Sequence, residues 1–201
     1  MKSKVKVVYK IPTMKKRVLY RNAETLVSDI NLCEPHHICM LDGSFIFGDF
    51  IEAFFVKNDF YTDELTISTL SMSENNVYNL RNLIDGGYVG KINLIVSDYF
   101  FSNEKWKLIK LIEKEVKNIK IFSVRTHTKI TIFEVDGKKI SITGSANMRT
   151  NGNYEQISID VSSDIYDFYY DTHKQMTKGF GMKAREDKGK VEYINIDDYG
   201  F

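Results

Sequence analysis

The sequence predicts an α/β fold in which helices pack on a sheet. Runs of strand character and runs of helical character alternate between residues 47 and 124, an order typical of parallel strands joined by right-handed crossovers. A hairpin signal follows at Asp136-Gly137 and adds antiparallel strands. The chain has 201 residues, 43% of them hydrophobic and 27% charged, so it is long enough for one well-cored globular domain.

The alternating region begins with a predicted helix. Residues 47–57 repeat large apolar side chains at helical spacing, and residues 65–70 are strand-like. Ser73 is a good N-cap for a second helix, which Gly86 and Gly87 end. The order then repeats, with a strand at 91–96, a helix opened by Ser102 or Asn103, and a strand at 120–124.

The second half of the chain predicts antiparallel pairing. Residues 128–133 and 139–143 are β-rich and flank Asp136-Gly137, a residue pair that favours a tight hairpin turn. Residues 156–161 alternate apolar and polar side chains, so we expect one more strand there. Ser162 or Ser163 then caps a final helix that ends at Gly179. The large side chains of this helix are Ile165, Phe168, Tyr169, Thr172 and Met176.

The two ends of the chain differ from its middle. We expect a basic N-terminal arm at 1–24, a single domain at 25–178 and a polar tail at 179–201. Every charged side chain from Met1 to Asn22 is basic, so the arm either contacts phosphate backbones or is simply solvated. No signal-peptide core follows, and no run reaches the ~18 apolar residues of a membrane span. With two cysteines, we expect a cytoplasmic protein without membrane contact, of a kind that a phage or mobile element can encode.

Four polar residues form the candidate site. His127 and Lys129 lie two apart at the start of a predicted strand, so their side chains point to one face. Ser145 and Asn147 follow the returning strand of the hairpin and again share a side. If the two strands pair, these residues gather at one end of the sheet. Lysine supplies charge, serine and asparagine supply directed donors, and histidine can attack, so the pattern predicts a phosphate site containing a nucleophile.

This pattern resembles the phospholipase D superfamily, the HKD phosphodiesterases. The resemblance rests on H-x-K, a hairpin, G-S-x-N and the downstream Glu155, and it is sharpest over Arg125 to Glu155. It covers about Asp42 to Lys178 and implies a mixed sheet flanked by helices on both faces. The usual aspartate of the motif, five residues after the lysine, is Glu134 here, and Asp136 lies two residues further on. The role of either acidic residue is open.

The resemblance also implies a mechanism that needs no metal and no other cofactor. His127 attacks phosphorus and forms a phosphohistidine, while Lys129 and Asn147 stabilise the charge on the non-bridging oxygens. Ser145 donates a further hydrogen bond. Glu155 is the expected partner of the second ring nitrogen of His127, which fixes the tautomer and orientation of the ring.

Such a mechanism uses two histidines, one as nucleophile and one as the acid that protonates the leaving group. Larger family members carry two motifs in one chain. This chain carries one, because His36, His37 and His173 are not followed by a lysine two residues later. We therefore expect a homodimer with the active site at the two-fold axis, where His127 of each protomer takes one role.

The expected substrate is DNA or RNA, because a single-motif member of this size resembles the small homodimeric nucleases more than the lipases. Arg125 and Arg149 flank the motif and either bind neighbouring phosphates or form surface ion pairs. Four aromatic residues fit either a nucleic-acid groove or the core: Tyr99, Phe100, Phe101 and Trp106. Two alternatives stay open, a non-catalytic nucleic-acid-binding module of the same fold and a phosphodiesterase acting on a phospholipid or other small phosphodiester.

One further cluster could suggest a zinc site. Cys33, His36, His37 and Cys39 lie close in sequence, but their spacing is crowded and no second ligand pair follows. We favour a buried strand that carries two ordinary thiols.

Overall fold

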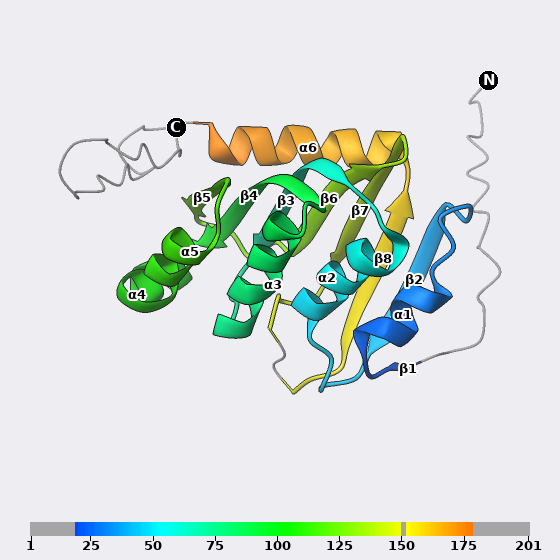
Figure 1. The fold of residues 1–201 in the computed structure, drawn as a ribbon, viewed down its shortest axis with the longest axis horizontal. Helices are drawn as coiled ribbons and strands as arrows, with labels where there is room; N and C mark the ends of the chain where they lie inside the picture. Colours follow the sequence, from blue (N-terminus) through cyan, green and yellow to red (C-terminus); the bar gives the residue numbers. More distant parts are fainter. Residues whose placement is uncertain (1–18, 150–151, 179–201) are drawn as a thin grey trace, which may run out of the picture.

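The computed structural model of the chain describes residues 19–149 and 152–178 (Figure 1). Most of the predicted arm, residues 1–18, and the predicted tail, residues 179–201, lie outside the described residues. The last part of the stretch predicted as an arm contains regular structure. Strand β1 (Leu19–Tyr20) pairs in parallel with β2, and helix α1 (Ala23–Asp29) follows it directly.

One mixed sheet organises the described residues. Its eight strands lie in the order β1-β2-β8-β7-β6-β3-β4-β5. The pairs β1–β2, β3–β4 and β4–β5 are parallel, and the remaining neighbours are antiparallel. The other strands are β2 (His36–Leu41), β3 (Thr62–Thr69), β4 (Val89–Ser97), β5 (Ile119–Val124), β6 (Ile130–Val135), β7 (Lys138–Gly144) and β8 (Glu155–Val161).

Helices cover both faces of this sheet, which confirms the predicted fold class (Figure 1). The helices α1 to α5 pack on one face, and α6 lies across the other, against β5, β6 and β7. Their bounds are α2 (Phe47–Asn58), α3 (Glu74–Asp85), α4 (Asp98–Glu104), the π-helical turn η1 (Lys105–Ile109), α5 (Lys110–Glu115) and α6 (Ser163–Thr177).

The main core lies between the sheet and the helices α1 to α5. Phe54 and Phe55 of α2 are fully buried and contact Phe133 of β6, with ring centroids 5.4 and 4.9 Å from its ring. Aromatic rings at these separations bury large apolar areas and add favourable edge interactions. Because Phe133 belongs to the β6–β7 hairpin, this packing fixes the hairpin that carries the candidate motif.

The helix after β4 begins earlier than the sequence predicted. We expected Ser102 or Asn103 to open it, whereas α4 begins at Asp98, directly after the strand. The hydroxyl of Ser97 accepts a hydrogen bond from the backbone N–H of Phe100 at 3.1 Å and caps the helix. The early start was missed because Ser97 is both the last residue of β4 and the N-cap, so no linker separates strand from helix.

The final helix begins where predicted, with Ser162 as its N-cap, and its buried residue is His173. Phe168 is 65% exposed, whereas His173 is 3% exposed. Neither ring nitrogen of His173 has a hydrogen-bond partner among the described residues. Burial lowers the pKa of His173 from 6.5 to about 4, so the ring is neutral near pH 7.

Candidate active site

The predicted hairpin is present and places the motif at one edge of the sheet. Strands β6 and β7 are joined by Asp136 and Gly137, whose φ angles of 50° and 70° match a tight primed turn. The register pairs Ile130 with Thr143, so Lys129 lies beside the end of β7. The carboxyl ends of β3, β4, β5 and β7 and the amino ends of β6 and β8 meet at this edge, which we call the site edge; it is the lower edge in Figure 1.

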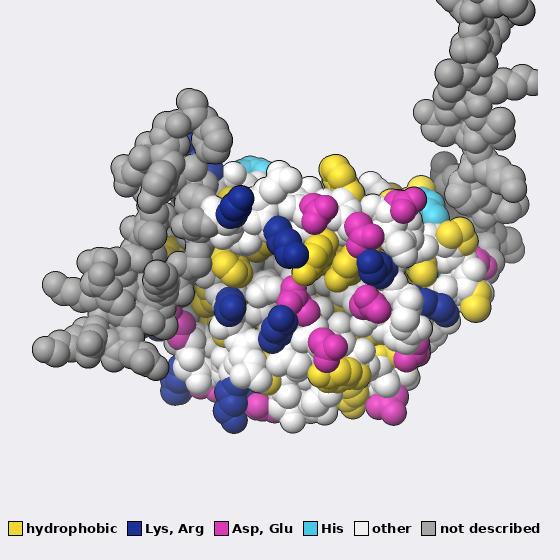
Figure 2. All heavy atoms as spheres, turned by 90° about the horizontal axis from the view of Figure 1, so that it is seen from above, with side chains coloured by type: hydrophobic (Ala, Val, Ile, Leu, Met, Phe, Trp, Pro, Cys, Tyr) yellow, Lys and Arg dark blue, Asp and Glu magenta, His cyan; other side chains and the backbone are white. Residues whose placement is uncertain are grey.

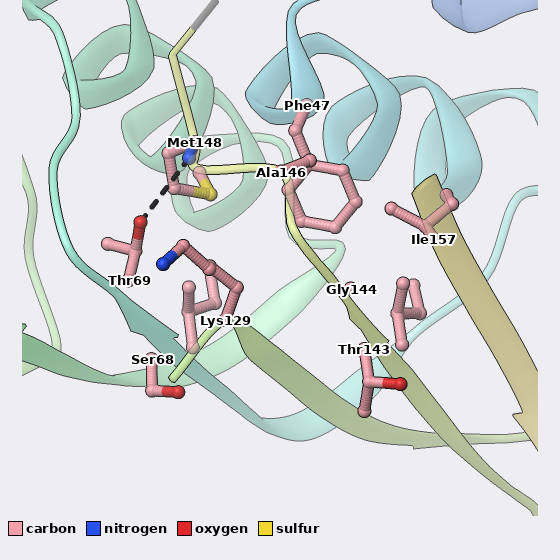
Figure 3. A pocket seen from close by; sticks show the side chains of 11 residues that line it. Phe47, Ser68, Thr69, Lys129, Thr143, Gly144, Ala146, Met148 and Ile157 are labelled. Carbon is pink, nitrogen blue, oxygen red and sulfur yellow. Dashed lines mark hydrogen bonds between the residues drawn. The ribbon is translucent and has the colours of Figure 1, made fainter. Parts of the chain in front are cut away.

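Lys129 lies in a shallow pocket at the site edge (Figure 3). The pocket is small, with room for about one water molecule, and it opens to solvent. Its lining includes Ser68 and Thr69 from the end of β3, Thr143 and Gly144 from the end of β7, and Phe47 from the start of α2. The ammonium group of Lys129 donates a hydrogen bond to the backbone oxygen of His127 at 2.8 Å. The lysine therefore holds the histidine segment while its charge stays in the pocket.

His127 is exposed in the segment that connects β5 to β6. Hydroxyl groups on either side of it fix this segment. The hydroxyl of Thr128 lies 2.9 Å from that of Ser68 and 2.9 Å from that of Thr126. The backbone N–H of Thr128 also donates to the Thr126 hydroxyl at 3.1 Å. The hydroxyl of Thr128 thus ties the residue after His127 to β3, Thr126 is tied to Thr128 in turn, and the imidazole between them is exposed.

Asn147 lies in the connection between β7 and β8 and is tied to the end of β3. Its side-chain oxygen accepts a hydrogen bond from the backbone N–H of Leu70 at 3.2 Å. The next residue, Met148, donates its N–H to the hydroxyl of Thr69 at 3.3 Å and accepts at its oxygen from the N–H of Gly48 at 2.9 Å. Because the amide oxygen of Asn147 is occupied, its NH₂ group is the part that is left to donate to a ligand.

Ser145 and Glu155 form a direct pair at the site edge. The hydroxyl of Ser145 donates a hydrogen bond to the carboxylate of Glu155 and accepts one from the backbone N–H of Gln156 at 3.1 Å. Backbone pairing holds the two strands together at this point, because the N–H of Ser145 donates to the oxygen of Gln156 at 2.9 Å. The expected contacts of Ser145 with phosphate and of Glu155 with the His127 ring stay predictions.

The other residues singled out in the sequence divide between the site edge and the far side. Arg125 is exposed in the same connection as His127, and Arg149 is exposed one residue after Met148, so both flank the motif as expected. Glu134 and Asp136 lie at the opposite end of the hairpin, where Glu134 pairs in register with Lys139. Neither acidic residue is therefore part of the site edge.

The remaining histidines lie away from the site. His36 bonds the carboxylate of Asp160 at 2.5 Å, at the end of β2 opposite the site edge, and His37 bonds the backbone oxygen of Asn31 at 3.0 Å. His173 belongs to α6 and is buried. The chain has four histidines, so His127 is the one that reaches this edge.

The cysteine and histidine cluster does not converge on a common point. Cys33 is exposed, whereas Cys39 is buried in β2, where burial, with a smaller contribution from the charge of Asp29, raises the pKa of its thiol to about 11. The neighbours His36 and His37 point to opposite faces of the strand. Within residues 19–149 and 152–178, no group of three or more metal-ligating side chains is arranged to hold a metal ion.

Sequence reasoning missed two hydroxyl residues, Ser68 and Thr69. Both are buried at the end of β3, and they position the His127 and Asn147 segments respectively. Two hydroxyl side chains at the carboxyl end of a predicted parallel strand were the available signal, because ligand sites of open α/β sheets lie at such strand ends.

Comparisons with known proteins agree with this architecture. A polyphosphate kinase from Porphyromonas gingivalis superposes with a TM-score of 0.58 at 12% identity, over 81% of this chain and 30% of the kinase. Nuc from Salmonella typhimurium, a phospholipase D family member, superposes with a TM-score of 0.54 at 14% identity, over 74% of this chain and 97% of Nuc. NucT from Helicobacter pylori superposes with a TM-score of 0.50 at 18% identity, over 60% of this chain and 82% of NucT.

The chain thus spans under a third of the kinase but most of Nuc and NucT. No protein-family model and no curated protein matches the sequence. The fold is the one found in the phospholipase D family, as the motif resemblance implied. Among the helices that the structure describes, none is long and apolar enough to cross a membrane.

Proposed function

We propose that the chain is a metal-independent phosphodiesterase, and specifically a nuclease that hydrolyses DNA or RNA through a phosphohistidine. The observation that carries this proposal is the meeting of His127, Lys129 and Asn147 at one edge of the sheet, beside a pocket. A nucleophile, a fixed cation and an amide donor are the groups that phosphoryl transfer needs when no metal neutralises the developing charge. The fold shared with Nuc supports the same chemistry.

In the first step, a ring nitrogen of His127 attacks phosphorus, and the bond from phosphorus to the leaving oxygen breaks. The ammonium group of Lys129 and the amide NH₂ of Asn147 stabilise the charge on the non-bridging oxygens. A second histidine gives a proton to the leaving oxygen. Water then gives a proton to the second histidine and attacks the phosphohistidine, the phosphorus–nitrogen bond breaks, and both histidines return to their starting states.

The second histidine in this proposal comes from another copy of the chain. The positions of the other three histidines support this, since two are bonded elsewhere and one is buried. His36 lies five residues from the site-edge end of β2, about 17 Å away at ~3.3 Å per residue. A homodimer with two-fold symmetry brings His127 of each protomer to one shared site.

Purified protein incubated with plasmid, single-stranded DNA and RNA in excess EDTA tests the proposal. We expect cleavage that resists the chelator and disappears in His127→Ala. His37→Ala is the matched control, because it removes a histidine at the far end of β2 and is expected to keep full activity. Nucleic-acid binding without cleavage by the wild type contradicts the catalytic proposal and favours the binding module. Activity restricted to a phospholipid or small diester overturns the assignment of substrate.

A further inference from the structure

The helical segment after β4 separates four aromatic residues into two groups. Phe100 and Phe101 are 7% and 4% exposed and belong to the core, whereas Tyr99 and Trp106 are 78% and 73% exposed. From the sequence alone, each of the four could belong either to the core or to a ligand-binding groove. A flat apolar partner that covers an exposed tryptophan and an exposed tyrosine removes their ring surfaces from water, which favours binding. The exposure of both rings on one short segment therefore points to a ligand.

Both exposed rings belong to one outward face of this segment. Exposed positions recur at helical spacing, three and four residues apart, from α4 through η1 to the start of α5. They are Tyr99, Ser102, Asn103, Trp106, Lys107 and Lys110. This set contains two aromatic residues and two lysines. The ammonium group of Lys107 lies 4.0 Å from the carboxylate of Glu74, in a solvent-exposed pair, and Lys110 lies against the Trp106 ring. The face therefore suits a partner that is both flat and anionic. Tyr99 and Trp106 are separated by about 10 Å along the helix axis.

Trp106 already binds cations through its ring. The ammonium groups of Lys110 and Lys105 lie 4.5 and 5.4 Å from the ring centroid. Cation–π contacts at exposed positions are weak, so a nucleobase can replace one of them. The displaced ammonium then stays within reach of the phosphate that accompanies the base, which couples stacking to charge neutralisation. The π-helical turn that carries Trp106 is a further feature that is frequent at functional sites.

The start of this segment is joined to the candidate active site by a short chain of hydrogen bonds. The N–H of Phe100 donates to the hydroxyl of Ser97, and that hydroxyl donates to the backbone oxygen of Leu70 at 3.2 Å. The N–H of Leu70 donates in turn to Asn147. On the other side, the carboxylate of Asp98 accepts from Ser123 at 2.7 Å, near the end of the strand that leads to His127. The exposed face therefore begins at the site edge.

We propose that Tyr99 and Trp106, with Lys105, Lys107 and Lys110, form a stacking surface for single-stranded nucleic acid that leads into the candidate active site. The inference rests on the proposed function for its choice of ligand and specifies the substrate as a single strand. Bases of a single strand are free to stack on aromatic side chains, whereas bases inside a duplex are stacked on one another. On the side of the molecule opposite the site edge, acidic and basic side chains are interspersed (Figure 2).

Trp106 is the single tryptophan of the chain, so its fluorescence reports directly on this surface. We would titrate full-length His127→Ala protein, in EDTA, with a single-stranded thymidine oligonucleotide of roughly 12 nucleotides and with a hairpin duplex. The single strand is expected to quench the emission and to bind more tightly than the duplex. Trp106→Ala and Tyr99→Ala in the same background should each weaken binding by about 5- to 100-fold, as measured by fluorescence anisotropy.

Two further variants complete the experiment. Trp106→Phe should recover part of the lost affinity, because it restores an aromatic ring. Phe168→Ala is the matched control, since it removes an equally exposed ring from α6 and is expected to change nothing. Oligonucleotide binding without quenching, equal binding by Trp106→Ala, or no binding at all overturns the inference. The two proposals can fail separately. If the oligonucleotide quenches the Trp106 emission and the variants bind it more weakly, but the wild-type protein cleaves no substrate, the stacking surface is supported and the proposed nuclease chemistry is contradicted.

Discussion

The side-chain oxygen of Asn147 accepts a hydrogen bond from the backbone N–H of Leu70 at 3.2 Å, which leaves the NH₂ group for a ligand. We therefore expect Asn147→Asp to keep the contact with Leu70 and the fold, while losing the donor and adding a negative charge beside the phosphate. The rate of diester cleavage should fall by about 100-fold or more. Asn147→Ala, which loses both contacts, should also lower the melting temperature. Full activity in Asn147→Asp would contradict the assigned role.

The carboxylate of Glu155 accepts a hydrogen bond from the hydroxyl of Ser145, and we propose that it also orients the ring of His127. Glu155→Gln retains an acceptor for Ser145 but removes the negative charge. Without the carboxylate, the imidazole would lose the partner that fixes its tautomer and orientation. The rate should fall on the order of 100-fold. Glu134→Gln, the same change at the opposite end of the hairpin, is the control, and an equal loss of rate in that variant would contradict the assigned role.

A site shared between two protomers makes a quantitative prediction for mixed dimers. If each active site needs His127 from both copies, a dimer with one His127→Ala protomer is inactive. Wild type and variant co-expressed in equal amounts should then give about a quarter of the activity of the same total amount of wild type. Independent sites would give about half. Light scattering at the assay concentration checks that the protein is dimeric, and a fully active monomer would refute the shared site.

Gly144 pairs with Ile157 of β8 and lies against the backbone of that strand. A Cβ atom at this position would lie 2.1 Å from the backbone oxygen of Gln156, and a backbone atom cannot move without shifting the strand. Gly144→Ala should therefore lower the free energy of unfolding by about 1–3 kcal/mol, as measured by urea denaturation. The neighbouring Thr143→Ala, which adds no atoms, should cost less. A Gly144→Ala protein with the same free energy of unfolding as the wild type would contradict this close approach of β7 and β8.

His173 predicts a loss of stability in acid. Its folded-state pKa is lowered to about 4 by burial, while the unfolded chain binds a proton near pH 6.5. The unfolded state therefore binds more protons between these values, so stability is complete above pH 6.5 and falls as the pH decreases toward 4. Between pH 7 and 4.5 the expected loss is on the order of 2 kcal/mol. His173→Leu should show a smaller loss in urea denaturation at the two pH values, and an equal loss would contradict the assignment.

The order of strands and helices from residue 47 onward was predictable, because alternation, caps and the Asp136-Gly137 turn are local signals. The motif residues were predictable for the same reason, since a tight hairpin fixes the register of Lys129 against Gly144. The first strand and helix, β1 and α1, were missed, whereas a strand was expected around Cys39, where β2 lies. Helix α1 has seven residues and buries two of them, Leu26 and Val27, which is too little periodicity to recognise in a sequence.

Contacts between distant segments could not be predicted. The Asn147–Leu70 and Ser68–Thr128 hydrogen bonds join residues 77 and 60 positions apart, and they depend on the pairing of β3 with β6. A strand order of this kind is set by tertiary packing, not by any one segment. Exposure was equally hidden, because Tyr99 and Phe100 are neighbours in sequence yet lie on opposite sides of a helix whose start was misplaced.

The Asp136-Gly137 turn is a suitable site for inserting a tag. It lies at the end of β7 opposite Gly144, about 20 Å from the site edge at ~3.3 Å per residue, and both of its residues are exposed. Exposed loop tips are the positions where inserted segments are best tolerated. A peptide tag placed in this turn would tether the protein to a surface with its site edge facing the solution. Binding of single-stranded nucleic acid could then be observed one molecule at a time.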